Sequence, residues 1–328
     1  MKVFFDEQVA IDKHLRGTRK KTQGGRFLTD LNKEALEKYE EAGRIASKVR
    51  ERMRSIVKEG MRIIKICEEA EETIRKMGGK PAFPCNVSVN EVAAHYTSPP
   101  GDKRTIPKRS VVKIDIGVHI DGYIADTATT LCFNPDYEDM VQTSQIALET
   151  AINTIRPGIS ISEFGSKIQS VIESRGFKPI SNLTGHQIKR YMIHAGKSLP
   201  NVSHISFRKI REGEVYAIEP FVTVLEAEGK VIEGKESHIF RFLKKKNLRL
   251  KESKNLLKII EKNFRTLPFA KRWLRRYGSM ELFEPAFMEL LKSRCVMAYP
   301  VFIEASGKWV AQFEHTVYIG KDGAVVLT

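Results

Sequence analysis

Two aspartates, Asp115 and Asp126, stand in a mostly apolar run of residues 111–133 that is rich in β-branched side chains. The run is divided by Ile120-Asp121-Gly122, an Asp-Gly sequence typical of a hairpin turn. If residues 120 and 121 form a two-residue loop, Asp115 lies directly opposite Asp126, with Cβ atoms about 5 Å apart. Two carboxylates so placed repel each other and resist burial, which favours a divalent metal ion between them. The alternative is a register that is off by one, with one aspartate in a turn or on the surface.

Three further side chains with metal-binding atoms occur in apolar or glycine-flanked settings. They are His186 in Thr-Gly-His-Gln, Glu219 in Ala-Ile-Glu-Pro-Phe, and Glu314 in Gln-Phe-Glu-His-Thr. The four carboxylates together would carry four negative charges, which two divalent cations neutralise. One imidazole among oxygen ligands favours Mn, Fe or Co over a thiolate-bound zinc. In the alternative interpretation Glu219 caps a backbone group and Glu314 pairs with an arginine. His315 would point to the opposite strand face and is not expected to be a ligand.

The elements that must position these residues show an internal repeat. Apolar spacing predicts two pairs of helices, over residues 32–60 and 63–77 and over residues 137–155 and 161–175. A shift of 98 residues superimposes the pairs, with Gly60 on Gly158 and Gly78 on Gly176. We therefore expect an α+β body of two pseudo-symmetric halves, with a shared sheet and a cleft between the halves.

Composition narrows the class of protein. The chain has 328 residues and no apolar run close to the roughly 20 residues of a membrane helix, so no membrane contact is expected. The first residues lack the apolar core of a signal peptide. The four cysteines include no Cys-x-x-Cys pair, which argues against a zinc knuckle or a disulfide framework. These features predict a cytoplasmic protein.

Charge is distributed unevenly along the chain. The net charge is +15, of which residues 1–33 contribute +4 and residues 241–294 contribute +11. We expect three parts: a basic N-terminal extension over residues 1–33, a catalytic body over residues 34–242 and 296–328, and an inserted helical subdomain over residues 243–295. Basic segments of this kind attract polyanions, so contact with ribosomal RNA through residues 1–33 and 241–294 is a hypothesis.

Several short motifs, in order and at compatible spacing over about residues 34–328, resemble the type II methionine aminopeptidases. They are Phe83-Pro84, Asn90-x-x-x-Ala-His95-Tyr-Thr-Ser-Pro, the hairpin with Asp115 and Asp126, Asn182-Leu-Thr-Gly-His186, Ile193-His194-Ala-Gly, Ala217-Ile-Glu219-Pro-Phe and Gln312-Phe-Glu314-His-Thr. The resemblance implies the pita-bread fold of two pseudo-symmetric halves, with a helical insertion in the second half. The chain looks archaeal in kind, because it lacks the long charged extension of eukaryotic type II enzymes.

The resemblance also implies two divalent metal ions, drawn from Co, Mn, Fe or Zn, with a water or hydroxide between them as the nucleophile. Asp126 and Glu314 would bridge the ions. Asp115 would hold one ion, and His186 with Glu219 would hold the other. The implied reaction is removal of the initiator methionine from nascent proteins with a small second residue.

Three residues would carry catalytic roles in this family. Glu219 would accept a proton and pass it to the leaving amine, His194 would stabilise the carbonyl oxygen, and His95 would contact the peptide near the leaving group. The methionine side chain would enter a pocket that includes Phe83, Ile193, His238 and Tyr299, together with His95 and His194. Of these, His238 is aligned only across a one-residue gap.

Two other interpretations compete with this one. A proline-directed peptidase, either a prolidase or an aminopeptidase P, shares the fold and the same set of acids and histidine. A catalytically silent relative could instead serve as an RNA- or ribosome-binding protein, which would suit the basic segments. Against the silent relative, all five ligand positions hold competent residues. A monomer is expected.

Overall fold

The computed structural model describes residues 32–277 and 280–328, so the expected extension over residues 1–33 lies outside the described residues except for its last two. Helix α2 (Lys33–Ile56) begins where the side chain of Asn32 accepts a hydrogen bond from the backbone N–H of Ala35 at 2.8 Å. Its buried residues recur at three- and four-residue spacing, as the sequence pattern predicts. A short link connects it to α3 (Ile63–Lys76).

The second helix pair repeats the first. It consists of α4 (Glu138–Thr154) and α5 (Ile161–Ser174), both within a residue or two of the predicted bounds. Gly60 and Gly158 adopt φ angles of 80° and 90°, which glycine reaches without strain. The N–H of Gly60 donates to the carbonyl of Ile106 at 2.8 Å, and that of Gly158 donates to Ile210 at 3.0 Å. The same turn therefore precedes α3 and α5, which confirms the predicted pseudo-symmetric halves.

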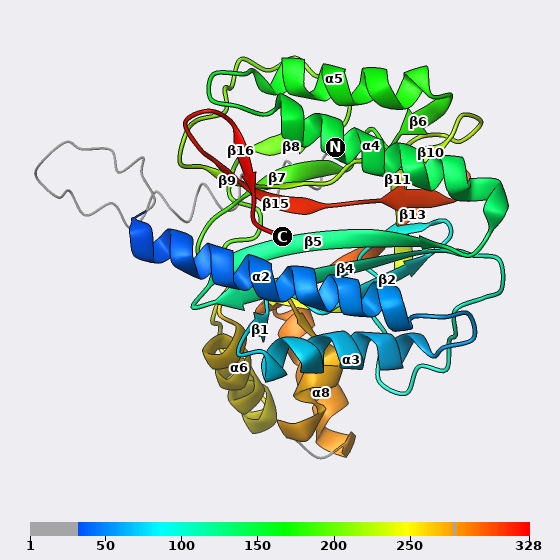
Figure 1. Cartoon of the computed structure of the whole chain (residues 1–328). Coiled ribbons are helices and arrows are strands. Elements are labelled where there is room, and N and C mark those ends of the chain that lie inside the picture. The colour runs from blue at the N-terminus through cyan, green and yellow to red at the C-terminus, as the bar shows by residue number, and fades with distance from the viewer. Residues whose placement is uncertain (1–31, 278–279) are drawn as a thin grey trace, which may run out of the picture.

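Short antiparallel strands build the sheets of the body. In the first half they are β1 (Lys80–Pro81), β2 (Asn86–Val89), β3 (Val92–Ala94), β4 (Val111–Ile120) and β5 (Tyr123–Cys132). The second half begins with the 3-10 turn η2 (Pro135–Tyr137) and contains β6 (Phe177–Pro179), β7 (Thr184–Ile188), β8 (Ser198–Pro200), β9 (Val215–Ile218) and β10 (Phe221–Val224). The later strands are β11 (Val231–Phe242), β13 (Val296–Glu304), β14 (Val310–Gln312), β15 (His315–Ile319) and β16 (Ala324–Val326). Figure 1 shows α2 and α3 over one half of the body and α4 and α5 over the other.

The central hairpin differs in register from the sequence prediction. Ile120 pairs with Tyr123, so the two-residue loop is Asp121-Gly122 and not Ile120-Asp121. Asp126 consequently lies opposite Gly117, and Asp115 lies opposite Ala128. The predicted direct pair of aspartates is therefore wrong. The two residues remain on one face of the hairpin as diagonal neighbours, because side chains two residues apart in a strand share a face.

Residues 243–295 form an insertion whose two ends lie side by side in the body. β11 and β13 pair as far as Phe242 with Val296, and the intervening chain connects these two strand ends. This segment contains α6 (Lys251–Phe264), β12 (Phe269–Ala270), α7 (Lys271–Leu274), η3 (Arg275–Tyr277) and α8 (Met280–Lys292). Its helices share an apolar cluster that includes Leu257, Ile260 and Phe287. Figure 1 shows α6 and α8 beside α3, at the far end from α5.

The two halves are joined along β5 and the segment that links β14 to β15. Ala128 and Glu314 form an antiparallel bridge through their backbone groups. The hydroxyl of Thr127 donates to the carbonyl of Glu314 at 2.8 Å, and that of Thr130 donates to the carbonyl of Gln312 at 2.6 Å. These contacts hold residues from the two halves in one fixed register.

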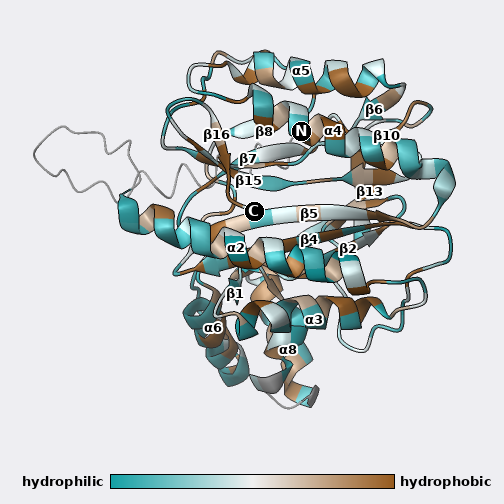
Figure 2. Ribbon diagram, in the orientation of Figure 1, coloured by the Kyte–Doolittle hydropathy of each residue, from teal (hydrophilic) through white to brown (hydrophobic). Residues whose placement is uncertain are grey.

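The distribution of polar and apolar residues agrees with helices that cover the strands on one side. Figure 2 shows hydrophilic and hydrophobic residues alternating along α2, whereas β4 behind it is mostly hydrophobic. Gly43 lies in α2 where a Cβ atom would overlap the backbone of Leu327, so glycine lets the chain end pack against the helix. Among the described residues, no helix is both long and apolar enough to cross a lipid bilayer.

Candidate metal centre

A cavity lies where the two halves meet, and all five predicted metal ligands line it. Asp115 comes from β4, Asp126 from β5 and His186 from β7, whereas Glu219 directly follows β9 and Glu314 lies between β14 and β15. The other residues that line the cavity are Phe83, Asn86, Ala94, His95, Ile193, His194, Ile239, Pro268, Tyr299 and Gln312. No lysine or arginine is among the described residues in this lining, so no protein cation there balances the carboxylates.

The two hairpin aspartates are held in place but are not fully paired. The Asn86 amide donates to Asp115 Oδ2 at 2.7 Å. The backbone of Asp126 exchanges two hydrogen bonds with the hydroxyl of Thr316, at 2.7 and 2.8 Å. The Oδ1 atoms of Asp115 and Asp126 are buried without a hydrogen-bond partner among the described residues. Such oxygens are costly to bury unless a cation or a donor occupies the cavity.

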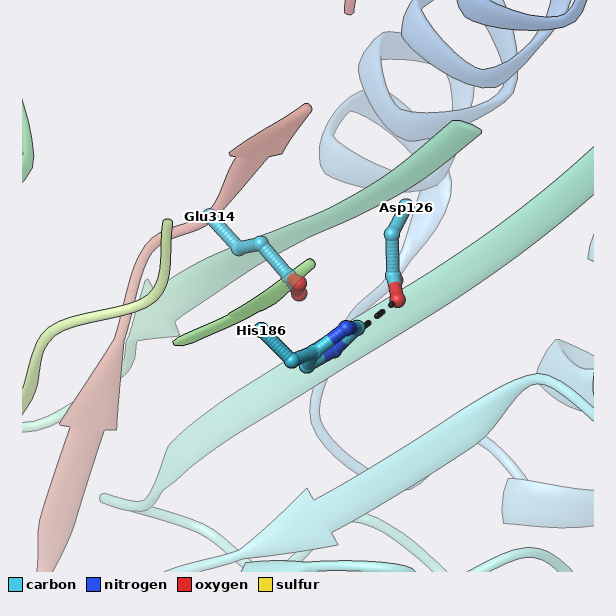
Figure 3. Close-up of side chains that lie close together, drawn as sticks. All are labelled: Asp126, His186 and Glu314. Carbon is cyan, nitrogen blue, oxygen red and sulfur yellow. Dashed lines mark ion pairs between the residues drawn. The ribbon is translucent and has the colours of Figure 1, made fainter. Parts of the chain in front are cut away.

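The imidazole of His186 lies among the carboxylates of both halves (Figure 3). Its Nε2 is 3.7 Å from Asp126 Oδ2 and 3.4 Å from Glu219 Oε1. Ligand atoms of Asp126, His186 and Glu314 all lie within 4.8 Å of one another. Two ligand atoms that bind the same ion, each at about 2.1 Å, lie roughly 3–4 Å apart. The distances among the ligand atoms of Asp126, His186 and Glu314 are close enough for them to share an ion.

Burial and mutual repulsion oppose the charged forms of these groups. Burial raises the pKa of Asp115 to about 7. Burial first, and then the nearby carboxylates, raise the pKa values of Asp126, Glu219 and Glu314 well above their ordinary range. Burial lowers the pKa of His186 to about 4, so its imidazole is neutral at pH 7 and can act as a ligand. The donor set, the unpaired oxygens and the neutral imidazole fit divalent cations.

Beside the carboxylates, two further histidines face the cavity. The ring of His194 meets the ring of His186 edge-on, with centroids 4.4 Å apart. The ring of His95 packs edge-on against Tyr299 at 5.6 Å. Burial lowers the pKa values of both His95 and His194, so each is neutral at pH 7. Phe83, Ile193 and Tyr299 complete an apolar wall next to them.

One predicted pocket residue lies elsewhere. His238 does not line this cavity: its Nε2 lies 3.0 Å from Glu236, and its ring packs edge-on against Tyr96. Ile239 lines the cavity in its place. The pairing of β11 with β13 shifts between Ser237 and Ile239, and this irregularity determines which side chain faces inward.

Sequence reasoning missed Asn86, Gln312 and Pro268. Gln312 donates to Glu219 Oε2 at 3.1 Å, and it precedes Glu314 by two residues, so strand alternation could have placed it on the same face. Asn86 pairs with Asp115 across two strands, which no local pattern reveals. Pro268 belongs to the segment between α6 and β12, for which the sequence offers no signal. His315 turns away from the cavity as predicted, and its Nδ1 lies 2.8 Å from the hydroxyl of Thr328.

A buried set of four carboxylates and one imidazole fits a metal-dependent enzyme, and comparison with known proteins identifies its class. Residues 37–321 match metallopeptidase family M24. A methionine aminopeptidase from Methanothermobacter thermautotrophicus is 44% identical over 297 residues, covering 89% of this chain and 98% of that protein. One from Saccharolobus solfataricus is 40% identical over 301 residues, covering 91% and 99%. The chain therefore belongs to the methionine aminopeptidases of metallopeptidase family M24.

Solved structures show the same fold at lower identity. A methionine aminopeptidase from Thermotoga maritima superposes with a TM-score of 0.66 at 22% identity, over 91% of this chain and 98% of that one. A thermophilic Arx1 gives 0.78 at 19% identity, over 90% and 91%. A prolidase from Pyrococcus furiosus gives 0.58 at 18% identity, over 92% of this chain and 65% of that one. These structures share the pita-bread fold, and the fold alone does not separate the two peptidase activities.

Proposed function

We propose that this chain removes the amino-terminal methionine from nascent proteins, using two divalent metal ions. Asp126 and Glu314 would be shared by the ions, with Asp115 on one side and His186 and Glu219 on the other. One observation carries the proposal: five metal-binding side chains from both halves converge in a buried cavity lined, among the described residues, by no lysine or arginine. Bound divalent ions would activate a water for attack and polarise the scissile carbonyl.

Glu219 has the position and the environment of a proton carrier. Its Oε2 accepts a hydrogen bond from Gln312 at 3.1 Å, while Oε1 faces His186 at 3.4 Å. Burial raises the pKa of Glu219, and a carboxylate with a raised pKa can take a proton from the attacking water and release it to the leaving amine. Gln312 keeps the carboxylate oriented through both steps.

His194 and His95 would act on the substrate backbone. Both imidazoles are neutral at pH 7, so each offers one N–H donor and one acceptor. We assign His194, which lies against His186, to the carbonyl oxygen of the scissile bond. We assign His95 to the peptide near the leaving group. The methionine side chain would lie against Phe83, Ile193 and Tyr299, an apolar wall suited to a thioether.

Peptide release tests this function directly. Full-length protein supplied with Mn²⁺ or Co²⁺ should release methionine from peptides that begin Met-Ala or Met-Gly, and should act poorly on Met-Lys peptides. Rapid cleavage of Xaa-Pro peptides would instead identify a proline-directed peptidase. An absence of turnover with every divalent metal, together with tight RNA binding, would identify a catalytically silent relative.

A second proposal is that the protein contacts ribosomal RNA. We also propose that it works as a monomer in the cytoplasm. Helix α6 exposes Lys251, Lys254, Lys258 and Lys262 at three- and four-residue spacing, so the lysines form one basic stripe. A stripe of this kind can neutralise several phosphates, and each contact steepens the dependence of binding on salt. The stripe belongs to the segment with the highest net charge in the chain.

The basic stripe can be tested with a matched pair of triple variants. Replacing Lys254, Lys258 and Lys262 by glutamine should weaken binding to purified ribosomes and flatten its salt dependence. Replacing the exposed Lys48, Lys103 and Lys167 by glutamine removes the same charge from other faces and should change binding little. Equal effects of the two triple variants would reject the stripe as the contact surface.

A further inference from the structure

Asn86 holds Asp115 by a direct hydrogen bond. The two residues lie directly opposite each other on β2 and β4, and the Asn86 amide donates to Asp115 Oδ2 at 2.7 Å. Because a carboxylate oxygen only accepts, this contact also fixes which end of the amide faces Asp115. Asn86 is 3% exposed, so the bond is shielded from bulk water. Because Asn86 holds Oδ2, it also sets the direction in which the Oδ1 atom of Asp115 points.

Cys85 directly precedes Asn86, and buried side chains hold both its backbone N–H and its backbone carbonyl. The N–H of Cys85 donates to Glu71 Oε1 at 3.1 Å. The carbonyl of Cys85 accepts from the hydroxyl of Thr97 at 2.7 Å. Glu71 belongs to α3 and is 2% exposed, an unusual place for a carboxylate without strong partners. The position of Asn86 therefore depends on where Glu71 is held.

Two partners of Glu71 come from the inserted segment, in addition to Arg75 of α3, whose guanidinium lies 3.9 Å from Glu71 Oε2. The guanidinium of Arg272 in α7 pairs with Glu71 Oε1 and also donates to the hydroxyl of Thr97 at 2.8 Å. The indole N–H of Trp273 donates to Glu71 Oε2 at 2.6 Å. One buried network thus runs from the insertion through Glu71 to Cys85 and Asn86, and ends on Asp115. Figure 1 shows α3 and β2, two of the elements that the network crosses.

We propose that Asn86 is the positioning residue for Asp115 and that the insertion holds it in place through Glu71. The inserted segment then helps to hold a metal ligand in position. This role is separate from the proposed contact of its basic stripe with RNA. This inference rests on the proposed two-ion function. Its physical basis is that a ligating carboxylate needs a fixed orientation, and partners that orient a ligand typically change metal affinity by about 10–100-fold.

Calorimetric titration of Mn²⁺ into metal-free, full-length protein tests the first step. The wild type should bind two ions, and Asn86→Leu, which keeps the shape but removes the donor, should weaken one of the two events by about 10–100-fold. Ser88→Ala is the matched control: Ser88 lies two residues along the same strand, is equally buried, and its hydroxyl has no partner among the described residues. This control should bind both ions as the wild type does.

The outcomes of this titration separate the inference from the function it rests on. Fewer than two ions bound by the wild type would contradict the two-ion function itself. Two ions bound normally by Asn86→Leu would overturn the positioning role. Equal weakening of both ions, or a lower melting temperature of the metal-free variant, would assign Asn86 a general structural role and would also overturn it.

Trp273→Phe tests the link to the insertion without removing a charge. It deletes the N–H that reaches Glu71 but keeps an aromatic ring at the position, so the fold should persist. A smaller loss of affinity is expected at the same ion, with little further loss when the change is combined with Asn86→Leu, because both act through one path. Arg104→Met, which breaks the exposed Arg104–Glu236 pair at 2.6 Å, is the control and should leave metal binding unchanged. Normal metal binding by Trp273→Phe, or additive losses in the double variant, would overturn the link.

Discussion

At the scale of single residues, the chemistry follows from carboxylates that the fold buries in a cavity whose described lining holds no lysine or arginine. Asp115, Asp126, Glu219 and Glu314 line one buried cavity, and His186 stands among them as a neutral base. Burial raises the pKa values of isolated carboxylates in such a place, which favours their protonated forms. Divalent cations reverse this preference, so metal binding and proton release are coupled.

This coupling predicts how pH affects stability. In the metal-free protein the pKa of Asp115 is about 7, above its ordinary value, so the folded state holds an extra proton at weakly acidic pH. The contribution of Asp115 to the stability of the metal-free form should therefore fall as pH rises from about 4 to 7, since this group binds more protons in the folded than in the unfolded state there. Metal binds the deprotonated form, so the rise in melting temperature caused by Mn²⁺ should grow between pH 5 and pH 8. A rise that shrinks over this range would contradict the ligand assignment.

At the scale of elements, most of the fold could be predicted from periodicity. The spacing of apolar residues predicts α2 to α5 closely, and glycines at a 98-residue offset reveal the repeat. The hairpin register could not be predicted as securely, because Ile120-Asp121 and Asp121-Gly122 are both plausible loops. The orientation of His238 depends on an irregularity in β11, which arises from pairing with β13 and leaves no local signal. The role of Asn86 could not be predicted for a related reason, because it depends on the pairing of β2 with β4.

Close packing between elements makes a specific prediction at Gly117. A Cβ atom there would overlap the ring of Phe83, which lines the cavity. Gly117→Ala should lower the free energy of unfolding by about 1–3 kcal/mol and raise KM for a Met-Ala peptide, because the ring must move. Gly43→Ala is the matched control, since its Cβ would overlap the backbone of Leu327, which does not line the cavity. It should cost similar stability at unchanged KM, and an unchanged KM for Gly117→Ala would remove Phe83 from the pocket.

At the scale of the whole molecule, the cavity lies on the junction between two similar halves. Each half supplies carboxylates, and backbone bridges such as that between Ala128 and Glu314 keep the two sets in register. Lys113 strengthens the same junction, because its buried amino group donates from β4 to the carbonyl of Val310 at 2.7 Å. Ions bound at this junction should stabilise both halves together, by about 2.7 kcal/mol for each ion at a hundredfold excess over its dissociation constant.

The most direct test of the central claim combines ion stoichiometry with methionine release for the wild type and Asp126→Asn. The proposed site predicts two divalent ions per wild-type chain. It predicts at most one ion for the folded variant, with kcat/KM on a Met-Ala peptide lowered by more than about 100-fold, beyond the loss expected for an outer partner of a ligand. Two ions and near wild-type turnover in Asp126→Asn would show that this carboxylate does not bridge the ions, and would contradict the account.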